Sequence, residues 1–348
     1  MWLVACSMRT CEFDYELPSE YIAQEPLPKR DSSRLLVASR ATNSLREYKF
    51  SDIINLFNPG DCIVLNDTKV MPARLFGRKP SGAQIEFLFI REELEDLWEV
   101  MIKPSKRIKE GTEVVFGDDF YASIVKKLPK GTWLARFNTK DVKSFMGRYG
   151  IMPTPPYIKK ELRDQERYQT VYAKASGAIA APTAGLHFTE RLLDSLKQKG
   201  ITLTFITLYV GMGTFRPIKA ENIEDHIMDE EEYYISSEAA EEINKAKRAG
   251  SRIIAVGTTV TRALESAAYK KDSLPSLMHS HNKTSLFIKP GYKFKIVDCL
   301  LTNFHLPRST NLILVSVFGG VSFIKKAYKY AVESKFRFYS FGDAMLII

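Results

Sequence analysis

The segment RIIAVGTTVTRALES, residues 252–266, joins a short apolar run to a helical pattern through a single glycine. The run 252–257 is predicted to be a buried strand and 261–269 a helix, with Gly257–Arg262 as the turn that opens the helix. The same alternation continues through the second half of the chain. Further strands are predicted at 62–65, 201–211 and 293–304, and further helices at 189–200, 236–250 and 322–336. Strands that alternate with helices indicate an α/β layer architecture.

A different pattern lies between residues 71 and 148. Six short runs with strand character are separated there by glycine, proline or charged turns: ARLFGRK, AQIEFLFI, LWEVMIK, TEVVFG, YASIVKKL and TWLARF. Six strands at this spacing predict a small β-barrel or sandwich. The prolines of MPTPPYIKK at 152–160 then mark a boundary. We therefore expect a discontinuous α/β domain, residues 13–70 with 151–348, layered with a mixed sheet and interrupted by an all-β barrel at 71–150.

The composition of the chain is typical of a globular protein and favours some classes of partner over others. A chain of 348 residues is long enough for two domains, and 45% hydrophobic residues are ordinary for a globular protein. The net charge of +9 favours a polyanionic partner such as nucleic acid, although charge alone identifies none. The four cysteines form no metal-binding spacing and indicate reduced thiols in a cytoplasmic protein. Apolar runs are too short for a membrane span. Signatures of serine hydrolases, P-loop proteins, zinc proteases and kinases are also missing.

Polar loops follow four of the predicted strands, where open α/β sheets place their functional groups. They are 66–69 (Asn-Asp-Thr-Lys), 211–216 (Gly-Met-Gly-Thr-Phe-Arg), 257–262 (Gly-Thr-Thr-Val-Thr-Arg) and 302–308 (Thr-Asn-Phe-His-Leu-Pro-Arg). The third suits an anion, through free N–H groups at a helix start. Structural alternatives remain open for each loop: backbone-bonded turns for the first two, capping by Thr259 or Thr261, and a structural histidine in the fourth.

Two further histidines lie outside these loops. In AAPTAGLHFT, residues 180–189, His187 follows small residues and precedes Thr189, a possible cap of the helix after it. Small neighbours would let a ligand approach the imidazole, whereas a packed core histidine is the structural alternative. His226 stands between Asp225 and, three residues on, Asp229. That spacing is poor for a metal and is better explained as a solvated acidic face.

Seven stretches that include these loops resemble one family closely, the S-adenosylmethionine:tRNA ribosyltransferase-isomerases of queuosine biosynthesis. In order, they are FDYELPSEYIAQEPLPKRDSSRLLV, LNDTKVMPARLFGRK, YQTVYAKASGAIAAPTAGLHFT, TLYVGMGTFRPI, EDHIMDEEEYYIS, VGTTVTRALESAA and LLTNFHLPRSTNLILVS. The resemblance runs from Phe13 to the end of the chain. It implies an α/β domain interrupted by a β-barrel. It also implies transfer and isomerisation of the ribosyl unit of S-adenosylmethionine onto 7-aminomethyl-7-deazaguanine at the tRNA wobble position, giving epoxyqueuosine, adenine and methionine.

The resemblance also implies the partners of the protein, and this sequence differs from the family at a few positions. S-adenosylmethionine would be a co-substrate, with no permanently bound cofactor or metal, and the polyanion would be a tRNA with a GUN anticodon. Separately from the resemblance, we expect a monomer. Residues 1–12 have no counterpart, which makes them an expected extension with Met8 as the start. Val260-Thr261 stands where relatives usually have Ser-Val, Lys289 replaces a common Tyr, and the chain ends early at GDAMLII. The main loops are intact, so activity is expected.

The matching positions provide the candidate site. The chemistry needs a base, an acid for the leaving adenine and anchors for methionine. His187 is the first acid/base candidate, His305 the second, and Asp225 a further catalytic carboxylate. Donor binding is expected at Asp67, Thr183, Gly185, Gly211, Gly213, Gly257, Thr258, Thr259, Arg262 and Asn303. Phosphate contacts are expected at Arg74, Arg78, Lys79, Lys103, Lys106 and Arg107, with base stacking on Phe304 or Tyr209.

Two other classes of function compete with this interpretation. A non-catalytic RNA-binding protein on the same scaffold would be expected to lack the polar loops, and all of them are present. A methyltransferase would need a glycine-rich nucleotide loop after its first strand, and a radical enzyme would need clustered cysteines; the sequence has neither.

Overall fold

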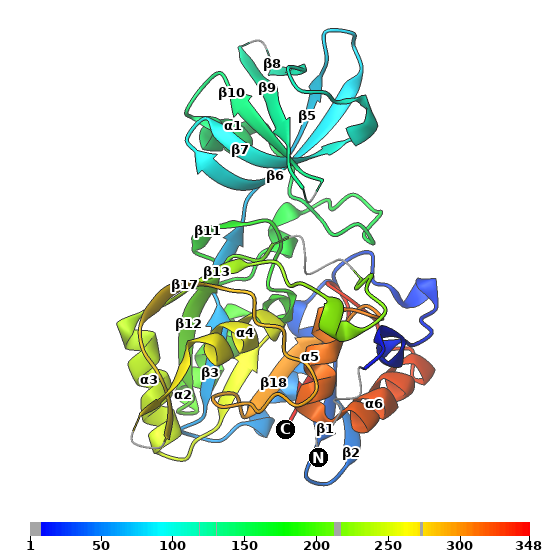
Figure 1. The fold of residues 1–348 in the computed structure, drawn as a ribbon. Coiled ribbons are helices and arrows are strands. Elements are labelled where there is room, and N and C mark those ends of the chain that lie inside the picture. Colours follow the sequence, from blue (N-terminus) through cyan, green and yellow to red (C-terminus); the bar gives the residue numbers. More distant parts are fainter. Residues whose placement is uncertain (1–7, 118, 130, 212–216, 272–273) are drawn as a thin grey trace, which may run out of the picture. The chain divides into compact units, whose positions relative to one another are not determined.

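The computed structural model describes residues 8–117, 119–129, 131–211, 217–271 and 274–348, and it divides them into two compact units (Figure 1). Unit 1 comprises the described residues of Met1–Lys69, Pro155–Ala175 and Ala181–Ile348, and unit 2 comprises those of Val70–Thr154 and Ser176–Ala180. The expected fold class, an α/β body together with a small all-β barrel, is confirmed. The expected domain boundaries remain predictions.

Unit 1 is built on a nine-stranded mixed sheet. Its strands are β1 (Arg34–Ser39), β2 (Ser44–Lys49), β3 (Cys62–Asn66), β12 (Thr202–Leu208), β13 (Glu231–Ile235), β14 (Ile253–Val256), β17 (Ser280–Thr284), β18 (Cys299–Asn303) and β19 (Ala344–Ile347). They are ordered β17, β13, β12, β3, β14, β18, β19, β1, β2. The central strands read as continuous apolar runs because both of their faces are buried, as all five residues of β3 are.

Strand direction decides which residues meet at one edge of this sheet. Neighbours among β12, β3, β14 and β18 pair in parallel, so their carboxyl ends lie together. Strand β19 runs antiparallel to β18 and parallel to β1. The amino ends of β19 and β1 therefore join the same edge. Four strand ends and two strand starts converge there from distant parts of the sequence.

Helices pack against both faces of the sheet. They are α2 (Glu190–Gln198), α3 (Ser237–Arg248), α4 (Thr258–Ala267), α5 (Thr310–Gly319) and α6 (Val321–Glu333). Helix α2 contributes three leucines to a core with alternate residues of β3 and β1, including Ile63 and Leu65. Helices α3 and α4 also pack against β3 and β14 but add no residue to that core, which places them on the opposite face.

The predicted N-terminus is confirmed for α2 and is wrong for α4. Thr189 caps α2 as expected, because its Oγ1 accepts from the Leu192 N–H at 3.1 Å. Helix α4 begins at Thr258, three residues earlier than predicted, and capping by Thr259 or Thr261 is wrong. Both threonines lie inside the helix, and Gly257 occupies the N-cap position with φ of 96° and ψ of 156°. Only glycine adopts that backbone conformation readily.

Shorter elements complete unit 1. The 3₁₀ helices in the described part of the unit are η1 (Thr10–Phe13), η2 (Ser19–Tyr21), η3 (Arg30–Ser32), η4 (Phe50–Leu56), η6 (Gln165–Tyr168), η7 (Thr183–His187) and η9 (Ile223–Asp225). Strands β15 (Ala268–Lys271) and β16 (Leu274–Leu277) form an antiparallel pair. Strands β4 (Thr68–Val70) and β11 (Ala175–Ala178) lie where the chain passes between units.

The longest helix in the described part of the chain, α6, has 13 residues. Within that part, no single helix has the length and apolar composition needed to cross a membrane. Helices α5 and α6 meet that test only as a pair, which is bent by 114°.

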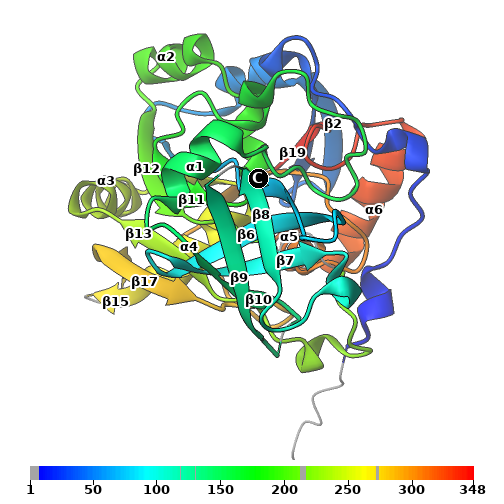
Figure 2. The ribbon, with the colours of Figure 1, turned by 90° about the horizontal axis from the view of Figure 1, so that it is seen from above.

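Unit 2 is a closed barrel (Figure 2). Its strands are β5 (Arg74–Arg78), β6 (Gln84–Leu94), β7 (Leu97–Lys103), β8 (Glu113–Gly117), β9 (Phe120–Lys127) and β10 (Trp133–Phe137), ordered β10, β7, β6, β5, β8, β9. All six predicted strands are confirmed, and an antiparallel barrel is the outcome. Phe87, Phe89 and Phe137 are buried together. Helix α1 (Val142–Tyr149) was not predicted, and η5 (Ser105–Arg107) is the unit's described 3₁₀ helix.

Candidate functional site

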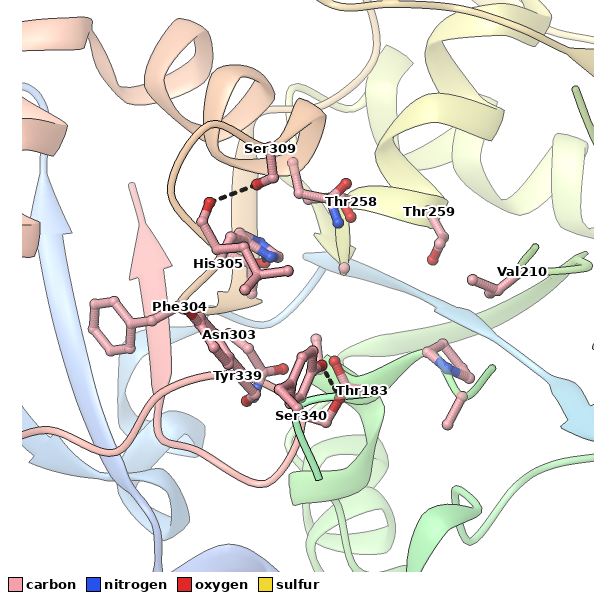
Figure 3. Close-up of a pocket in the computed structure, with 18 residues that line it drawn as sticks. Thr183, Val210, Thr258, Thr259, Asn303, Phe304, His305, Ser309, Tyr339 and Ser340 are labelled. Atoms are coloured by element: carbon pink, nitrogen blue, oxygen red, sulfur yellow. Dashed lines mark hydrogen bonds between the residues drawn. The ribbon is translucent and has the colours of Figure 1, made fainter. Parts of the chain in front are cut away.

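A cavity opens in unit 1 at the edge where the strand ends converge (Figure 3). Its empty volume is about 590 Å³, counting the open solvent at its mouth. The lining residues come from η7, from the ends of β12, β14 and β18, from the starts of α4 and α5, and from the loop before β19. They are Tyr157, Ala181–Ala184, Val210, Gly257–Thr259, Thr302–Leu306, Ser309, Asn311, Tyr339 and Ser340.

Six of the residues predicted for catalysis or donor binding line this cavity. They are Thr183, Gly257, Thr258, Thr259, Asn303 and His305. The adjacency of β14 and β18 brings most of them together, because the Gly257 N–H donates to the Leu301 carbonyl at 2.7 Å. The turn that opens α4 and the loop after β18 therefore lie side by side. Figure 3 shows Thr258 and Thr259 on one side of the cavity and Thr183 and Ser340 on another.

Two buried polar atoms of the lining have no hydrogen-bond partner among the described residues. They are Oγ1 of Thr259 and Oδ1 of Asn303, and the residues are 7% and 2% exposed. Leaving a buried polar atom unpaired costs about 1–3 kcal/mol, so such atoms are rare in folded proteins. Thr259 also lies in the first turn of α4, whose N–H groups have no partner within the helix. The cavity thus presents unsatisfied groups that a polar ligand would complete.

His305 is the histidine that lines the cavity. Thr302 Oγ1 and His305 Nε2 lie 2.7 Å apart and share a hydrogen bond. Two tyrosines hold its peptide group: Tyr15 Oη donates to the His305 carbonyl at 2.5 Å, and the His305 N–H donates to Tyr328 Oη at 3.0 Å. Nδ1 makes no hydrogen bond to a described residue. Burial lowers the pKa of His305, which keeps the imidazole neutral at pH 7.

His187 lies in the core beside the cavity and is not one of its lining residues. Its ring stacks on Phe50 with centroids 4.8 Å apart. Nδ1 lies 2.8 Å from Ser33 Oγ, and Nε2 lies 3.2 Å from Asn303 Nδ2. Burial, followed by the charges of two nearby arginines, lowers the pKa of His187 to about 3. This geometry agrees with the alternative of a packed core histidine, and its acid/base role remains a prediction.

Arg262 does not reach the cavity, although it lies one turn after Thr259. Its guanidinium forms a buried ion pair with Glu231 and also donates to two backbone carbonyls. The other carboxylate oxygen of Glu231 accepts from the Gly211 N–H at 3.0 Å. Neither Arg262 nor Gly211 lines the cavity, and Gly213 lies outside the described residues. Sequence reasoning missed Glu231 because nothing in EEEYYI separates it from its acidic neighbours.

The remaining predicted residues of unit 1 also lie away from the cavity. Asp67 accepts from Thr207 Oγ1 at 2.7 Å, and burial raises the pKa of the Asp67 carboxyl. Gly185 is required by packing, because a Cβ there would lie 2.1 Å from Tyr172 Oη. Asp225 is exposed at the end of η9. None of the three lines the cavity, and their proposed roles remain predictions.

The predicted phosphate contacts all belong to unit 2. Arg74 pairs with Glu86 at 3.2 Å, and Arg78, Lys103 and Lys106 are exposed. Lys79 is half-buried. The side chain of Arg107 is outside the described part of the structure.

The two aromatic residues suggested for base stacking differ in exposure. Phe304 is fully buried among Tyr328, Phe336 and Phe338, so its ring is not free to stack on a base. Tyr209 is half-buried and remains a candidate.

Several lining residues were missed by the sequence analysis. Tyr339 and Ser340 precede β19, and Tyr157, Ser309 and Asn311 come from loops and the start of α5. The polar loops were predicted at the carboxyl ends of strands, whereas β19 runs antiparallel to β18 and brings its amino end to the cavity. The polar stretch before the last apolar run of the chain was the available signal.

A second cavity in unit 1 has an empty volume of about 900 Å³, counted in the same way as that of the first cavity. It lies between residues 12–16 and the helices α5 and α6, and no predicted site residue lines it. Among the residues that the structure describes, no group of three or more His, Cys, Asp or Glu is placed to hold a metal ion.

Comparison with known proteins agrees with the sequence resemblance. The family model described as "Queuosine biosynthesis protein" matches residues 10–347. A protein from Halothermothrix orenii named S-adenosylmethionine:tRNA ribosyltransferase-isomerase is 52% identical over 98% of this chain and 100% of its own length. One of the same name from Staphylococcus epidermidis is 51% identical over 97% of this chain and 99% of its own length. A crystal structure of S-adenosylmethionine tRNA ribosyltransferase from Thermotoga maritima is 38% identical, with a TM-score of 0.56 over 97% of this chain and 100% of that chain.

Proposed function

The chain belongs to the queuosine biosynthesis protein family and is a tRNA ribosyltransferase-isomerase, and from this premise we propose how its cavity serves the reaction. The ribosyl unit of S-adenosylmethionine is transferred to 7-aminomethyl-7-deazaguanine at the wobble position of a tRNA with a GUN anticodon. Isomerisation gives epoxyqueuosine, while adenine and methionine leave. The names of relatives that are more than 50% identical over nearly the whole chain support this assignment.

The cavity at the edge where the strand ends converge is the proposed site for S-adenosylmethionine. The observation that carries this proposal is the pair of unpartnered buried atoms, Thr259 Oγ1 and Asn303 Oδ1, which belong to two of the six lining residues predicted for catalysis or donor binding. The methionine carboxylate is placed at the start of α4. There the N–H groups of the first turn and the positive end of the helix dipole favour an anion. Arg262 is left out of this contact because Glu231 already holds its charge.

His305 is the residue proposed to move the proton. The sulfonium makes the 5′ carbon of the ribosyl unit acidic, so a neutral imidazole can take that proton and later deliver it to the departing adenine. His305 is neutral at pH 7, and its Nδ1 is the ring nitrogen not held by Thr302. Positioned acid/base groups contribute about 10²–10⁴-fold to a rate, so His305→Gln should lower kcat by that factor with little change in KM. His279→Gln, at an exposed position that does not line the cavity, is the matched control, and an unchanged kcat in His305→Gln would remove His305 from this role.

The basic residues of unit 2 are the proposed contacts for the tRNA backbone. Arg78, Lys103 and Lys106 are exposed and free of a described acidic partner at ion-pair distance. Phosphate contacts release counterions, so tRNA affinity should fall linearly on a log–log plot against salt concentration. The slope should become less negative by about one for each lysine changed to alanine. A slope that does not change in the Lys103→Ala/Lys106→Ala variant would place the tRNA elsewhere.

We propose further that the enzyme acts as a cytoplasmic monomer and uses S-adenosylmethionine as a co-substrate, with no permanently bound cofactor. The overall function is tested by incubating the protein with S-adenosylmethionine and tRNA that carries the deazaguanine precursor. Free adenine and methionine are the expected products. Methylated tRNA with S-adenosylhomocysteine would indicate a methyltransferase instead, and tRNA binding without either product would indicate a non-catalytic RNA-binding protein.

A further inference from the structure

The side chain of Asn303 has its orientation fixed by two neighbours. Its Nδ2 lies 3.1 Å from the Tyr339 carbonyl oxygen and 3.2 Å from Nε2 of His187. A backbone carbonyl can only accept a hydrogen bond, so the NH₂ end of the amide must face Tyr339. Both amide hydrogens are then donated within the protein. Oδ1 points away from these partners and is the atom without one.

The same contacts decide the tautomer of His187. Because Nδ2 of Asn303 donates to Nε2, that ring nitrogen must carry the lone pair, and the proton of a neutral ring lies on Nδ1. Nδ1 in turn lies 2.8 Å from Ser33 Oγ, which can accept it. If the ring were protonated, the Nε2–H of His187 would face the Nδ2–H of Asn303, and two donors would oppose each other. The ring is held in place by stacking on Phe50.

From this chain of contacts we infer that His187 is a positioning residue, which holds Asn303 so that Oδ1 accepts a hydrogen bond from the α-ammonium group of S-adenosylmethionine. The inference rests on the proposed function and assigns one group of the substrate to one atom of the site. Asn303 ends β18 and Thr259 lies just after β14, the neighbouring parallel strand. Adjacent strands are about 4.8 Å apart, a spacing that the ammonium and the carboxylate of one amino acid can bridge.

The two unpartnered atoms match the two ends of an amino acid. Oδ1 of Asn303 can only accept, which suits an ammonium, and the hydroxyl of Thr259 can donate, as can the free N–H groups of α4, which suits a carboxylate. Adenine and ribose also offer donors, so the experiment must separate these groups from the ammonium.

A cycle of two ligands and two proteins makes that separation. S-adenosylmethionine and its analogue without the α-amino group are titrated into wild-type protein and Asn303→Ala by calorimetry. Loss of a hydrogen bond to a charged group weakens binding by about 10- to 100-fold, and we expect this loss for S-adenosylmethionine on Asn303→Ala. The deaminated analogue should bind both proteins equally. An equal loss for both ligands would assign Oδ1 to adenine or ribose and overturn the inference. Asn55→Ala, at an exposed position of η4 that does not line the cavity, is the matched control.

The role of His187 is tested by its kinetic pattern and its tautomer. His187→Phe keeps the stacking on Phe50 and removes the acceptor, so KM for S-adenosylmethionine should rise by about 10- to 100-fold with kcat largely kept. A fall in kcat at saturating substrate, with a changed pH–rate profile, would show an acid/base role instead. Long-range ¹H–¹⁵N spectra of the wild-type protein do not depend on a variant that folds. They should show His187 with the proton on Nδ1 between pH 5.5 and 8.

A proton on Nε2, or a charged ring in that range, would contradict the inference. Failure of the inference is distinct from failure of the proposed function. Wild-type protein that releases no adenine refutes the function, whereas active protein with either contrary result refutes only the contact.

Discussion

Removing the charge of Glu231 should leave the buried guanidinium of Arg262 without a counter-ion in unit 1. The side chains of Glu231 and Arg262 are 5% and 6% exposed, and they form an ion pair between β13 and α4. Glu231→Gln keeps the shape of the side chain and an oxygen for the Gly211 N–H but leaves the guanidinium without its counter-ion. This variant also tests whether Arg262 is committed to the core, as the geometry indicates, or available to a substrate carboxylate.

The magnitude follows from the burial of the pair. Breaking a buried ion pair by removing one partner costs about 3–5 kcal/mol. Arg262 keeps its contacts with the carbonyls of Leu286 and Thr284, at 3.1 and 3.4 Å, so the lower end of that range applies. For domains of roughly 150–250 residues each kcal/mol lowers Tm by about 2–4 °C, so a loss of 3 kcal/mol predicts a fall of about 6–12 °C.

Thermal unfolding followed by calorimetry measures this fall, and the next residue of the same strand provides the control. Glu232 pairs with His281 at the surface, where such pairs contribute about 0–1 kcal/mol. Glu232→Gln should therefore change Tm by no more than about 4 °C. If both variants unfold at the same temperature, the Glu231–Arg262 pair does not stabilise the core, and Arg262 becomes available again as a ligand for the donor.

Two further predictions concern α4 and His187. Gly257→Ala forces a side chain into a backbone conformation with φ of 96°, which should lower the free energy of unfolding in urea by about 1–3 kcal/mol. Gly147→Ala, at an exposed position inside α1 where alanine is favoured, should cause no loss, and a Gly257→Ala variant as stable as the wild type would refute the strain. The pKa of His187 falls from 6.5 to about 3 on folding, so between these pH values the unfolded chain binds the extra proton. The contribution of His187 to the free energy of unfolding is therefore fully present above pH 6.5. It falls as the pH is lowered, by up to about 1.4 kcal/mol per pH unit. Urea unfolding at pH 7, 6 and 5 should show a steeper decline in wild type than in His187→Phe, and parallel declines would contradict the lowered pKa.

The sequence predicted the fold class and six of the residues that line the cavity for a physical reason. Alternation between strand and helix patterns identified the α/β body, and Gly257 with the threonines after it marked a turn at a strand end. Since the carboxyl ends of parallel strands meet at one edge, Asn303 and Thr258 could be expected together. The six strands of the barrel followed in the same way from short apolar runs between turns.

The rest of the site depends on contacts that no local pattern contains. His187 looked poised for catalysis because its neighbours in the chain are small, yet its neighbours in space are Phe50 and Ser33. Arg262 looked free until the fold placed Glu231, from another strand, against it. Ser340 was missed because an antiparallel strand carries its amino end to the edge where parallel strands finish.

Binding of S-adenosylmethionine to a variant with a filled cavity tests the central claim most directly. Thr183→Tyr adds a ring to a half-buried position of the lining, and Gln198→Tyr adds the same ring to an exposed position on α2. Calorimetric titration should show no detectable binding to Thr183→Tyr and wild-type affinity for Gln198→Tyr, with both proteins folded by thermal unfolding. Wild-type affinity in Thr183→Tyr would place the donor outside this cavity and contradict the account.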